Sequence, residues 1–525
     1  MDKLPRPSIL TVDVGSSSIK AAIVAADGQI HALRARPTPY LAASPPAFTV
    51  DMDAIWATAL ALLREVVAQV GSKEIDAIAV TALGDGTWLL DCNGRPAGPA
   101  LLWRDGRSST VLDRWQREGR LEQVAYFTGT KPTTAHQTTQ LAWLAESAPQ
   151  ILQQARHVLF AEDWIGYALT GEIAVCQSNY EHTYGHLSQA GRDRQAPLNR
   201  VLEILDLTWV LPLLPEPKSS LEVRGGLSRE AGSALGLPAG LPVFAGPFDV
   251  LTAALGSGAV APEQACSIWG TAAIHQRWTS SFQPAEPGYL VCHPQDSRRW
   301  LRFVATSAGM TNLDYWRHVL YASDPSTHDL PWPDLEANVA KIPPGADGLI
   351  YLPYLTASGE RSERVGGPPG AGFLGIHEGH GRHHYLRAVY EGLAIQAART
   401  YRRLSAAGQP LREIRVSGGG GQSNLLAQIL AHATGLTVTR TANREAGLLG
   451  TAMLAMTGLG YVKDIDTFAA TVVRPERVFA PDPKQSEQYR QISGKVDALL
   501  ASLAHFSADS EDQGRLDRIE TPSVC

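Results

Sequence analysis

The sequence is poor in cysteine and lacks any long apolar run. Its 525 residues include five cysteines, which lie far apart and form no C-x-x-C pair. This spacing argues against a disulfide framework or a zinc site and is typical of reduced thiols in a cytosol. No run of about 18 apolar residues occurs, and the N-terminal MDKLPRPS has no signal-peptide core. We therefore expect a soluble cytoplasmic protein without a membrane segment.

Basic residues are not in excess either. The chain has 46 Lys and Arg against 52 Asp and Glu, a formal net charge of −6. Such a balance provides no general attraction to nucleic acid or to an anionic membrane surface. Hydrophobic residues make up 44% of the sequence, enough for two or more domains with cores of their own. Small-molecule chemistry is the expected type of function.

The stretch TVDVGSSSIKAAIVAADGQI has a Gly/Ser cluster but is not a P-loop. An apolar strand reaches the cluster, and a second strand follows it instead of a helix, with an Asp27-Gly28 turn before a third strand. G-x-x-x-x-G-K-[ST] is absent. Lys20 is placed to reach a phosphate, and Asp13 to hold Mg²⁺ directly or through water; a strand-end aspartate is also an ordinary turn residue. The cluster consists of Gly15, Ser16, Ser17 and Ser18.

A second unit of this kind occurs in ACSIWGTAAIHQRW, where a strand reaches Gly270-Thr271 and another strand follows. The two turns lie about half the chain apart, which indicates an internal duplication with the turns facing each other across a cleft. Two unrelated hairpins are the alternative. Between them, DAIWATALALLREVVAQV and TTQLAWLAESAPQILQQA predict helices and EIDAIAVTAL a strand. This alternation predicts an α/β fold.

Two further stretches fit nucleotide chemistry. In VSGGGGQSNLLAQILAHATG a strand, four glycines and a helix allow close approach of a nucleotide. Ser423 breaks the G-x-G-x-x-G pattern, and a flexible turn is the alternative. In LPVFAGPFDVLTAALG, Asp249 follows a strand and starts a helix. A carboxylate there can accept a hydroxyl proton during phosphoryl transfer, or can simply cap the helix.

Other polar residues follow short apolar strands. Asp85 in TALGDGTWLLD, and Asp105 and Arg107 in LLWRDGRSS, are placed to bind a polyhydroxylated ligand, although each Asp-Gly is also an ordinary turn. HEGHGRHH, residues 377 to 384, has four histidines but no Cys or Asp at ligand spacing. We interpret it as a solvated helix entry and not as a metal site.

Taken together, these motifs resemble the FGGY family of carbohydrate kinases, within the wider sugar kinase, Hsp70 and actin superfamily. AGFLGIHEGHGRHHYLRAVYEG resembles the C-terminal signature of the family, with Tyr385 in place of an aliphatic residue. HQTTQLAWLAES resembles the N-terminal signature, with Gln140 in place of lysine. The resemblance implies an α/β fold of two ribonuclease-H-like (actin-like ATPase) domains with a catalytic cleft between them. The expected domains are 8–256, with the sugar side and the first phosphate hairpin, and 257–500, with the second hairpin and the adenosine site; 501–525 is an expected flexible tail.

The resemblance also implies roles for individual residues. Asp249 becomes the general base and Asp13 the Mg²⁺ ligand. The ATP phosphates would contact Gly15, Ser16, Ser17, Ser18, Lys20, Gly270 and Thr271, and the adenosine would contact Gly419, Gly420 and Asn424, with His432 where many members have Asp. The sugar or polyol would contact Gly84, Asp85, Trp103, Asp105, Arg107, His136, Gln137, Phe248 and Asp249.

The substrate loop narrows the expected activity. Gly84 and Asp85 stand where glycerol kinases have Arg and Glu, and GDGTWLLD with LWRDGRSS is more similar to erythritol and L-xylulose kinases. We predict ATP- and Mg²⁺-dependent phosphorylation of a four- or five-carbon polyol or ketose, erythritol first, at a terminal hydroxyl. Ketopentose and glycerol kinases are alternatives. The expected partners are this small molecule and at most a second copy of the chain in a homodimer, with no nucleic acid or membrane.

Two other classes of protein remain as rivals. One is an actin- or Hsp70-like ATPase switch, which would need a partner-binding module; the sequence shows no appended peptide-binding β-domain. The other is a transcription-regulating sugar sensor, which would need a basic helix-turn-helix segment that the sequence lacks.

Overall fold

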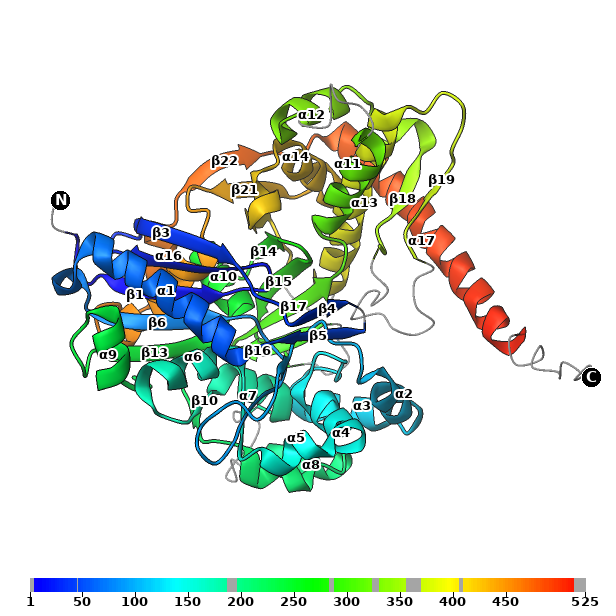
Figure 1. Ribbon diagram of the computed structural model, residues 1–525. Helices are drawn as coiled ribbons and strands as arrows, with labels where there is room; N and C mark the ends of the chain where they lie inside the picture. The colour runs from blue at the N-terminus through cyan, green and yellow to red at the C-terminus, as the bar shows by residue number, and fades with distance from the viewer. Residues whose placement is uncertain are drawn as a thin grey trace, which may run out of the picture.

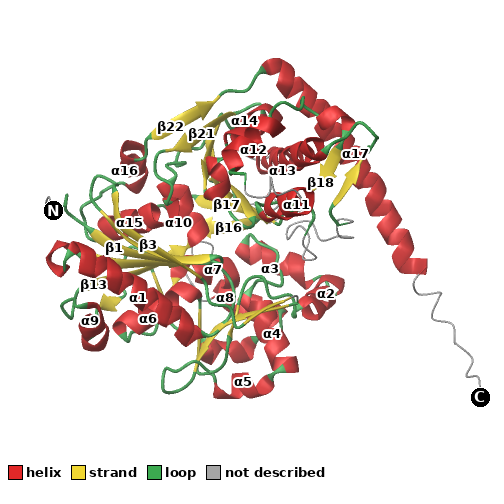
Figure 2. Cartoon of the chain, turned by 45° about the horizontal axis from the view of Figure 1, so that its top comes forward, coloured by secondary structure: helices red, strands yellow, loops and turns green. Residues whose placement is uncertain are grey.

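The computed structural model describes residues 4–44, 46–186, 196–282, 288–322, 330–355, 370–405 and 409–513. Two large sheets have helices on both sides (Figures 1 and 2). The first sheet has the order β12 (Gly225–Gly226), β13 (Pro242–Phe248), β6 (Ala77–Ala82), β1 (Ile9–Val14), β2 (Ser18–Val24) and β3 (Ile30–Pro37). The second has the order β16 (Tyr289–Cys292), β17 (Trp300–Thr306), β15 (Ala273–Thr279), β14 (Gln264–Trp269), β20 (Glu413–Ser417), β21 (Thr437–Thr441) and β22 (Pro475–Phe479).

The two sheets share one topology. In the first, β1 pairs antiparallel with β2 and parallel with β6. In the second, β14 pairs antiparallel with β15 and parallel with β20. The central strands β1 and β6 are almost continuous apolar runs because helices cover both faces, whereas the edge strand β3 is charged and largely exposed. The repeated pattern is what an internal duplication predicts.

The helices follow the predicted order with local differences. The helix predicted from TTQLAWLAESAPQILQQA is two helices, because Pro149 starts a new one. The first half has α1 (Met52–Val70), α2 (Ser109–Arg117), α3 (Arg120–Thr128), α4 (Gln137–Ser147), α5 (Pro149–Gln154), α6 (Ala161–Thr170), α7 (Gln177–Tyr184), α8 (Ala196–Ile204) and α9 (Arg229–Leu235). The second half has α11 (Thr311–Tyr321), α12 (Trp332–Val339), α13 (Arg382–Ser405), α14 (Asn424–Thr434), α15 (Ala446–Gly458), α16 (Ile465–Val472) and α17 (Pro483–Gln513).

Short strands complete the loops: β4 (Ala42–Ser44), β5 (Ala47–Val50), β7 (Trp88–Leu90), β8 (Ala100–Leu101), β9 (His157–Leu159), β10 (Val175–Cys176), β11 (Pro217–Lys218), β18 (Ile350–Leu352) and β19 (Gly372–Leu374). The last helix, α17, runs along the body and then leaves it (Figure 1). It continues to Gln513, so it includes thirteen residues that the sequence assigned to a flexible tail. The rest of that tail, 514–525, lies outside the described residues.

Helix α10 (Asp249–Gly256) connects the two sheets and crosses α15 at very short range. A Cβ atom on Gly256 would lie 1.8 Å from the Ala446 carbonyl oxygen, and one on Gly450 would lie 1.9 Å from the Thr252 carbonyl oxygen. Backbone therefore touches backbone, which only glycine allows. Helix α15 comes from the second half of the chain but packs against β1 and β6 of the first sheet. A buried apolar cluster that includes Leu251 and Met453 surrounds this crossing.

No helix in the described ranges is long and apolar enough to span a bilayer.

Candidate functional site

The two predicted turns face each other. The first lies between β1 and β2, where the Gly15 amide donates to the Ser18 carbonyl at 3.1 Å; the second lies between β14 and β15, where the Gly270 amide donates to the Ala272 carbonyl at 3.0 Å. The Ser17 Oγ atom is 2.6 Å from Thr271 Oγ1. The structure thus brings the predicted phosphate-side residues of both halves into one place.

Asp13 lies beside these turns and has one carboxylate oxygen that accepts no hydrogen bond from the described residues. It is paired across the hairpin with Lys20, whose Nζ lies 2.6 Å from Glu445 Oε2 at the start of α15. Asp13 Oδ1 is buried and has no hydrogen-bond partner among the described residues. Desolvation raises the pKa of Asp13 to about 6, with Lys20 opposing and Glu445 adding to the shift. An orphaned carboxylate oxygen fits a hard cation such as Mg²⁺.

Asp249 is the first residue of α10 and directly follows β13 of the first sheet. Phe248 takes the N-cap position, and the helix has no side-chain capping bond, so the structure does not support the capping interpretation. Desolvation raises the pKa of Asp249 to about 8, and the negative charges of Asp13 and Asp85 add to the shift. A carboxyl group with a pKa near neutrality, close to two other carboxylates, suits proton transfer.

Gly84 leaves room for the Phe248 ring and has no side chain that could contact a ligand. A Cβ atom at position 84 would lie 2.3 Å from Phe248 Cδ2, so the ring fills the space that any side chain at this position would need. Asp85 follows with a positive φ of 59°. Gln137, predicted to contact substrate, donates from Nε2 to the Gly86 carbonyl at 3.3 Å and to the Leu159 carbonyl at 2.8 Å. In the structure it holds the Asp85 loop in place.

Trp103 joins the predicted sugar side to the phosphate side, since its Nε1 donates to Ser16 Oγ at 2.8 Å. Asp105 and Arg107 form an ion pair with each other. The Arg107 guanidinium approaches the Asp105 carboxylate at 2.7 Å and lies over the Trp143 ring at 4.5 Å. Asp105 also accepts the Phe48 amide at 3.0 Å. Both side chains shape this loop, and their direct contact with substrate stays a prediction.

Asp85 and His136 lie together with His182, a residue that the sequence reasoning missed. These three side chains offer ligand atoms that all lie within 4.8 Å of one another. His136 stacks on Tyr289 from the second sheet, with ring centroids 5.6 Å apart. His182 lies on α7, whose sequence QSNYEHTY has no apolar face although seven of its eight residues are buried. The sequence carried no signal for His182, because a polar segment of this kind is typical of a solvated helix and its burial is visible only in the structure.

The second turn is joined to the glycine run by a loop that the sequence reasoning also missed. The Met310 amide donates to the Gly270 carbonyl at 3.0 Å, and Thr311 Oγ1 donates to the Thr271 carbonyl at 2.8 Å. A Cβ atom on Gly420 would lie 2.2 Å from Met310 Sδ, whereas one on Gly419 would meet nothing within 4 Å. The signal was WLRFVATSAGMTN, an apolar strand followed by small residues and a helix.

The predicted adenosine side is organised by polar contacts. Asn424 Oδ1 accepts from Arg440 Nη1 at 3.0 Å, and Ser423 caps α14 by accepting the Leu426 amide at 2.9 Å. His432 accepts the Asp482 amide at 3.1 Å on Nδ1, so it connects α14 to the start of α17.

The histidine-rich stretch forms no metal cluster. Within the described ranges, Asp85, His136 and His182 are the group in which three or more side chains could bind one metal ion. Residues 377 to 384 contain no such group. His384 Nε2 instead lies 3.1 Å from Asp347 Oδ2. The solvated helix entry is therefore the better interpretation, although an aspartate partner is present that the sequence spacing did not indicate.

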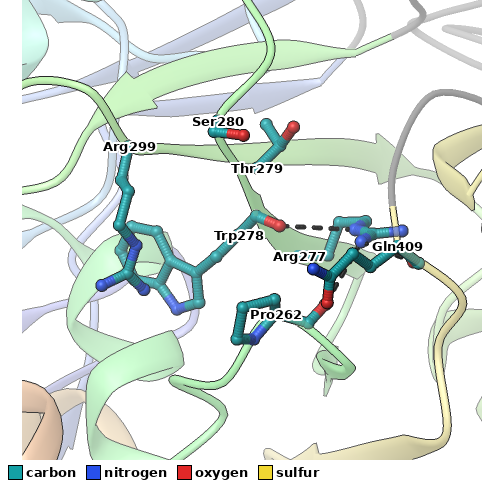
Figure 3. A pocket seen from close by; sticks show the side chains of 7 residues that line it. All are labelled: Pro262, Arg277, Trp278, Thr279, Ser280, Arg299 and Gln409. Atoms are coloured by element: carbon teal, nitrogen blue, oxygen red, sulfur yellow. Dashed lines mark hydrogen bonds between the residues drawn. The ribbon is translucent and has the colours of Figure 1, made fainter.

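A small pocket of about 160 Å³ lies elsewhere, at the far end of β15. Figure 3 shows Arg299 and Arg277 on opposite sides of Pro262. Arg277 Nη2 donates to the Gln409 carbonyl at 2.9 Å, and Arg299 pairs with Asp466. None of the predicted site residues lines this pocket, so the chemistry is placed at the turns and not here.

Comparison with known proteins identifies the family of the chain. The model of the FGGY family of carbohydrate kinases matches with its N-terminal domain over residues 8–256 and with its C-terminal domain over residues 265–459. The chain belongs to the FGGY family of carbohydrate kinases. It is therefore a kinase of small sugars or polyols that uses ATP as phosphate donor, and the predicted family and enzyme class are confirmed.

Relatives cover nearly the whole chain. The erythritol kinase of Brucella abortus is 31% identical over 92% of this chain and 94% of its own length. The L-xylulose/3-keto-L-gulonate kinase of Escherichia coli is 27% identical over 95% and 98%. The crystal structure of xylulose kinase from Rhodospirillum rubrum superposes with a TM-score of 0.83 at 25% identity, covering 95% of this chain and 100% of the other. The predicted two-domain ribonuclease-H-like fold is thereby confirmed.

Proposed function

We propose that this kinase phosphorylates a polyol or ketose of four or five carbons, with erythritol as the preferred substrate, at a terminal hydroxyl. Two relatives are named an erythritol kinase and an L-xylulose/3-keto-L-gulonate kinase. Erythritol has four carbons and L-xylulose five, which supports this size, whereas 3-keto-L-gulonate has six. The observation that carries the proposal is the position of Asp249. Its carboxyl group lies within electrostatic reach of Asp13 on the phosphate side and of Asp85 on the substrate side.

In this proposal the side chains divide the work of one phosphoryl transfer. Asp249 accepts the proton of the terminal hydroxyl. At the same time the hydroxyl oxygen of the substrate forms a bond to the γ-phosphorus, and the bond between the γ-phosphorus and the leaving oxygen of ADP breaks. Lys20 and the amides of the two turns bind phosphate oxygens. When bound, ATP supplies the phosphoryl group and Mg²⁺ offsets phosphate charge. Asp13, with its orphaned Oδ1, would hold the ion.

Water must be kept from the same phosphoryl group. Phe248, Tyr289 and Phe303 are each no more than 4% exposed and lie next to one another between the two sheets, with ring centroids 4.9 Å apart for Tyr289 and Phe303. These rings would flank the carbon chain of a polyol and exclude water from Asp249. Exclusion of water favours transfer over hydrolysis.

A coupled ADP-release assay tests the proposal. Tetritols, pentitols, pentuloses and glycerol are supplied one at a time at several concentrations. We expect ATP consumption only with an added polyol or ketose and the highest kcat/KM with erythritol. ATP hydrolysis that ignores every added substrate would instead indicate an ATPase switch, and a preference for glycerol would refute the proposed chain length.

A ketopentose is the second candidate substrate. The L-xylulose/3-keto-L-gulonate kinase matches the chain over as great a length as the erythritol kinase does. L-xylulose and D-xylulose in the same panel decide between the two, since the better substrate is the one with the higher kcat/KM.

The cytoplasmic location and the homodimer stay predictions. Cys92, Cys176, Cys266 and Cys292 are all free, in agreement with a reducing compartment. Light scattering of the purified chain measures its mass in solution directly. A mass twice that of the 56.5 kDa chain is the expected result for the homodimer.

A further inference from the structure

His182 is a buried imidazole without a hydrogen bond. Its side chain is 2% exposed, and neither ring nitrogen has a hydrogen-bond partner in the described part of the chain. Nε2 lies 3.3 Å from Asp85 Oδ1, but the two groups are not oriented to form a hydrogen bond. Buried polar groups in native proteins nearly always have a partner because an unsatisfied one costs free energy. The missing partner is therefore expected from outside the chain.

The surroundings of His182 place this partner in the proposed substrate site. Its ring centroid is 5.0 Å from that of His136, 5.4 Å from Tyr289 and 5.7 Å from Phe248. Phe248 directly precedes Asp249 in the chain, so the ring that His182 contacts belongs to the neighbour of the proton acceptor. Helix α7 packs against both β13 and β16, and His182 therefore lies where elements of the two sheets meet (Figure 1).

We propose that His182 binds a hydroxyl of the substrate other than the one that is phosphorylated, an inference that rests on the proposed kinase function. A neutral imidazole offers one N–H donor and one acceptor nitrogen, and a carboxylate only accepts. A hydroxyl can accept from the His182 ring while it donates to Asp85, so one group of the substrate can bind both side chains. The flanking rings suit the C–H surface of a polyol chain. His182 is then a residue that determines how tightly the substrate binds.

A divalent metal ion is the other ligand that Asp85, His136 and His182 could share, since two imidazoles and a carboxylate form a common metal-binding set. The hydrogen bonding of His136 disfavours it. The Thr133 amide donates to His136 Nδ1 at 3.0 Å, so in the neutral ring the proton is on Nε2. That nitrogen cannot then donate a lone pair to a metal. A hydroxyl ligand is therefore the inference that the geometry favours.

Replacing His182 and a matched histidine tests the inference. His182→Phe keeps a ring and removes both polar nitrogens, while His182→Gln restores one donor and one acceptor. The control is His186→Gln, because His186 is also fully buried and its Nε2 also has no hydrogen-bond partner in the described ranges, but its Nδ1 lies 3.2 Å from Glu181 Oε2. Thermal melting and the ADP dissociation constant, measured for each variant, show that the fold and the nucleotide side are intact.

The expected result is a loss of substrate affinity. His182→Phe raises KM for erythritol about 10-fold or more with kcat changed less than about 3-fold, His182→Gln recovers part of the loss, and His186→Gln leaves KM unchanged. An unchanged KM in a well-folded His182→Phe variant would overturn the inference.

Binding measurements separate failure of this inference from failure of the proposed function. Calorimetry with erythritol and ADP detects substrate binding without turnover, so His182 can be tested even if the chain phosphorylates none of the panel. Weaker erythritol binding in His182→Phe supports the inference. Calorimetry with zinc chloride contradicts it if the wild type binds the ion tightly and His182→Phe does not, because the three side chains would then form a metal site.

Discussion

Ser17 and Thr271 are hydrogen-bonded to each other through their hydroxyl groups at 2.6 Å, although 254 residues separate them in the chain. One belongs to the turn after β1 and the other to the turn after β14. Because the hydroxyls touch, a phosphate group can enter between them only if the turns separate. Since we propose that the phosphates of ATP bind here, we predict that the two halves of the kinase move relative to each other in the course of a catalytic cycle.

A cross-link between these residues tests this movement. The double variant Ser17→Cys/Thr271→Cys, with Cys92→Ser to remove the exposed thiol, places two sulfurs within bonding range. We expect oxidation to form a disulfide that abolishes turnover, dithiothreitol to restore turnover, and ADP to protect the thiols from oxidation. Mass spectrometry of a digest identifies the bond. Full activity of the cross-linked protein would show that the turns do not separate around the phosphates.

The ion pair between Lys20 and Glu445 predicts competition with phosphate. Since Glu445 holds Lys20 at 2.6 Å, Glu445→Gln frees the ammonium group for phosphate oxygens. We expect Glu445→Gln to bind ADP several-fold more tightly in the absence of Mg²⁺, and Lys20→Met to bind it about 10-fold more weakly or worse. Both changes shrink at high salt because charge interactions are screened.

Calorimetry in low and high salt measures these affinities. Glu65→Gln is the control, because Glu65 pairs with Arg36 on the exposed edge of the first sheet. An ADP affinity that falls in Glu445→Gln would mean that Glu445 supports the nucleotide instead of competing with it.

Replacing Asp249 separates catalysis from stability. Asp249→Asn should reduce turnover by about 10²- to 10⁴-fold, the usual worth of a general base, with ADP binding unchanged. The pKa of Asp249 is raised to about 8 in the folded protein, from an ordinary value of 3.8. The folded state therefore holds this proton more tightly than the unfolded state does, and the stability that this provides is lost as the pH rises from about 4 through 8.

Melting temperatures at two pH values measure this effect. Asp249→Asn should melt a few degrees higher than the wild type at pH 8 and show little difference at pH 4. Near-normal turnover in this variant would remove Asp249 from the mechanism, and a stability gain that does not depend on pH would contradict the raised pKa.

The close contact between Gly84 and Phe248 predicts that adding one methyl group at position 84 lowers stability and activity. A Cβ atom 2.3 Å from the ring must displace Phe248, at a cost of about 1–3 kcal/mol. Because Phe248 precedes Asp249, we expect Gly84→Ala to lower both the unfolding free energy and kcat/KM. In the control Gly494→Ala, the new methyl group meets no atom within 4 Å on the exposed side of α17. It should leave kcat/KM unchanged and raise the unfolding free energy slightly, because alanine favours a helix interior over glycine. Denaturant titration and the ADP-release assay give the two readouts.

The sequence predicted the parts of the site that are local in the chain. Strand, small-residue turn and strand are contiguous around Gly15 and Gly270, and Asp13 and Asp249 directly adjoin strand ends, so periodicity located them. The repeated topology followed because a duplicated segment repeats its hydrophobic pattern. These features need no knowledge of how distant segments pack.

Contacts between distant segments explain what the sequence could not provide. Glu445 reaches Lys20, and His182 reaches Asp85, only because α15 and α7 pack where they do. Arg107 was expected to contact substrate, yet its guanidinium lies over the ring of Trp143 on α4 and pairs with Asp105. Which of these pairings forms is decided by packing, and a single sequence does not display packing.

Helices α10 and α15 cross in direct backbone contact where the two halves of this kinase meet. Gly256 and Gly450 leave no side chain between the helices that could yield on its own. Helix α10 starts at Asp249, and Glu445 directly precedes α15. We predict that rotation of one half about this crossing moves Asp249 and Glu445 in the same event that separates the two turns.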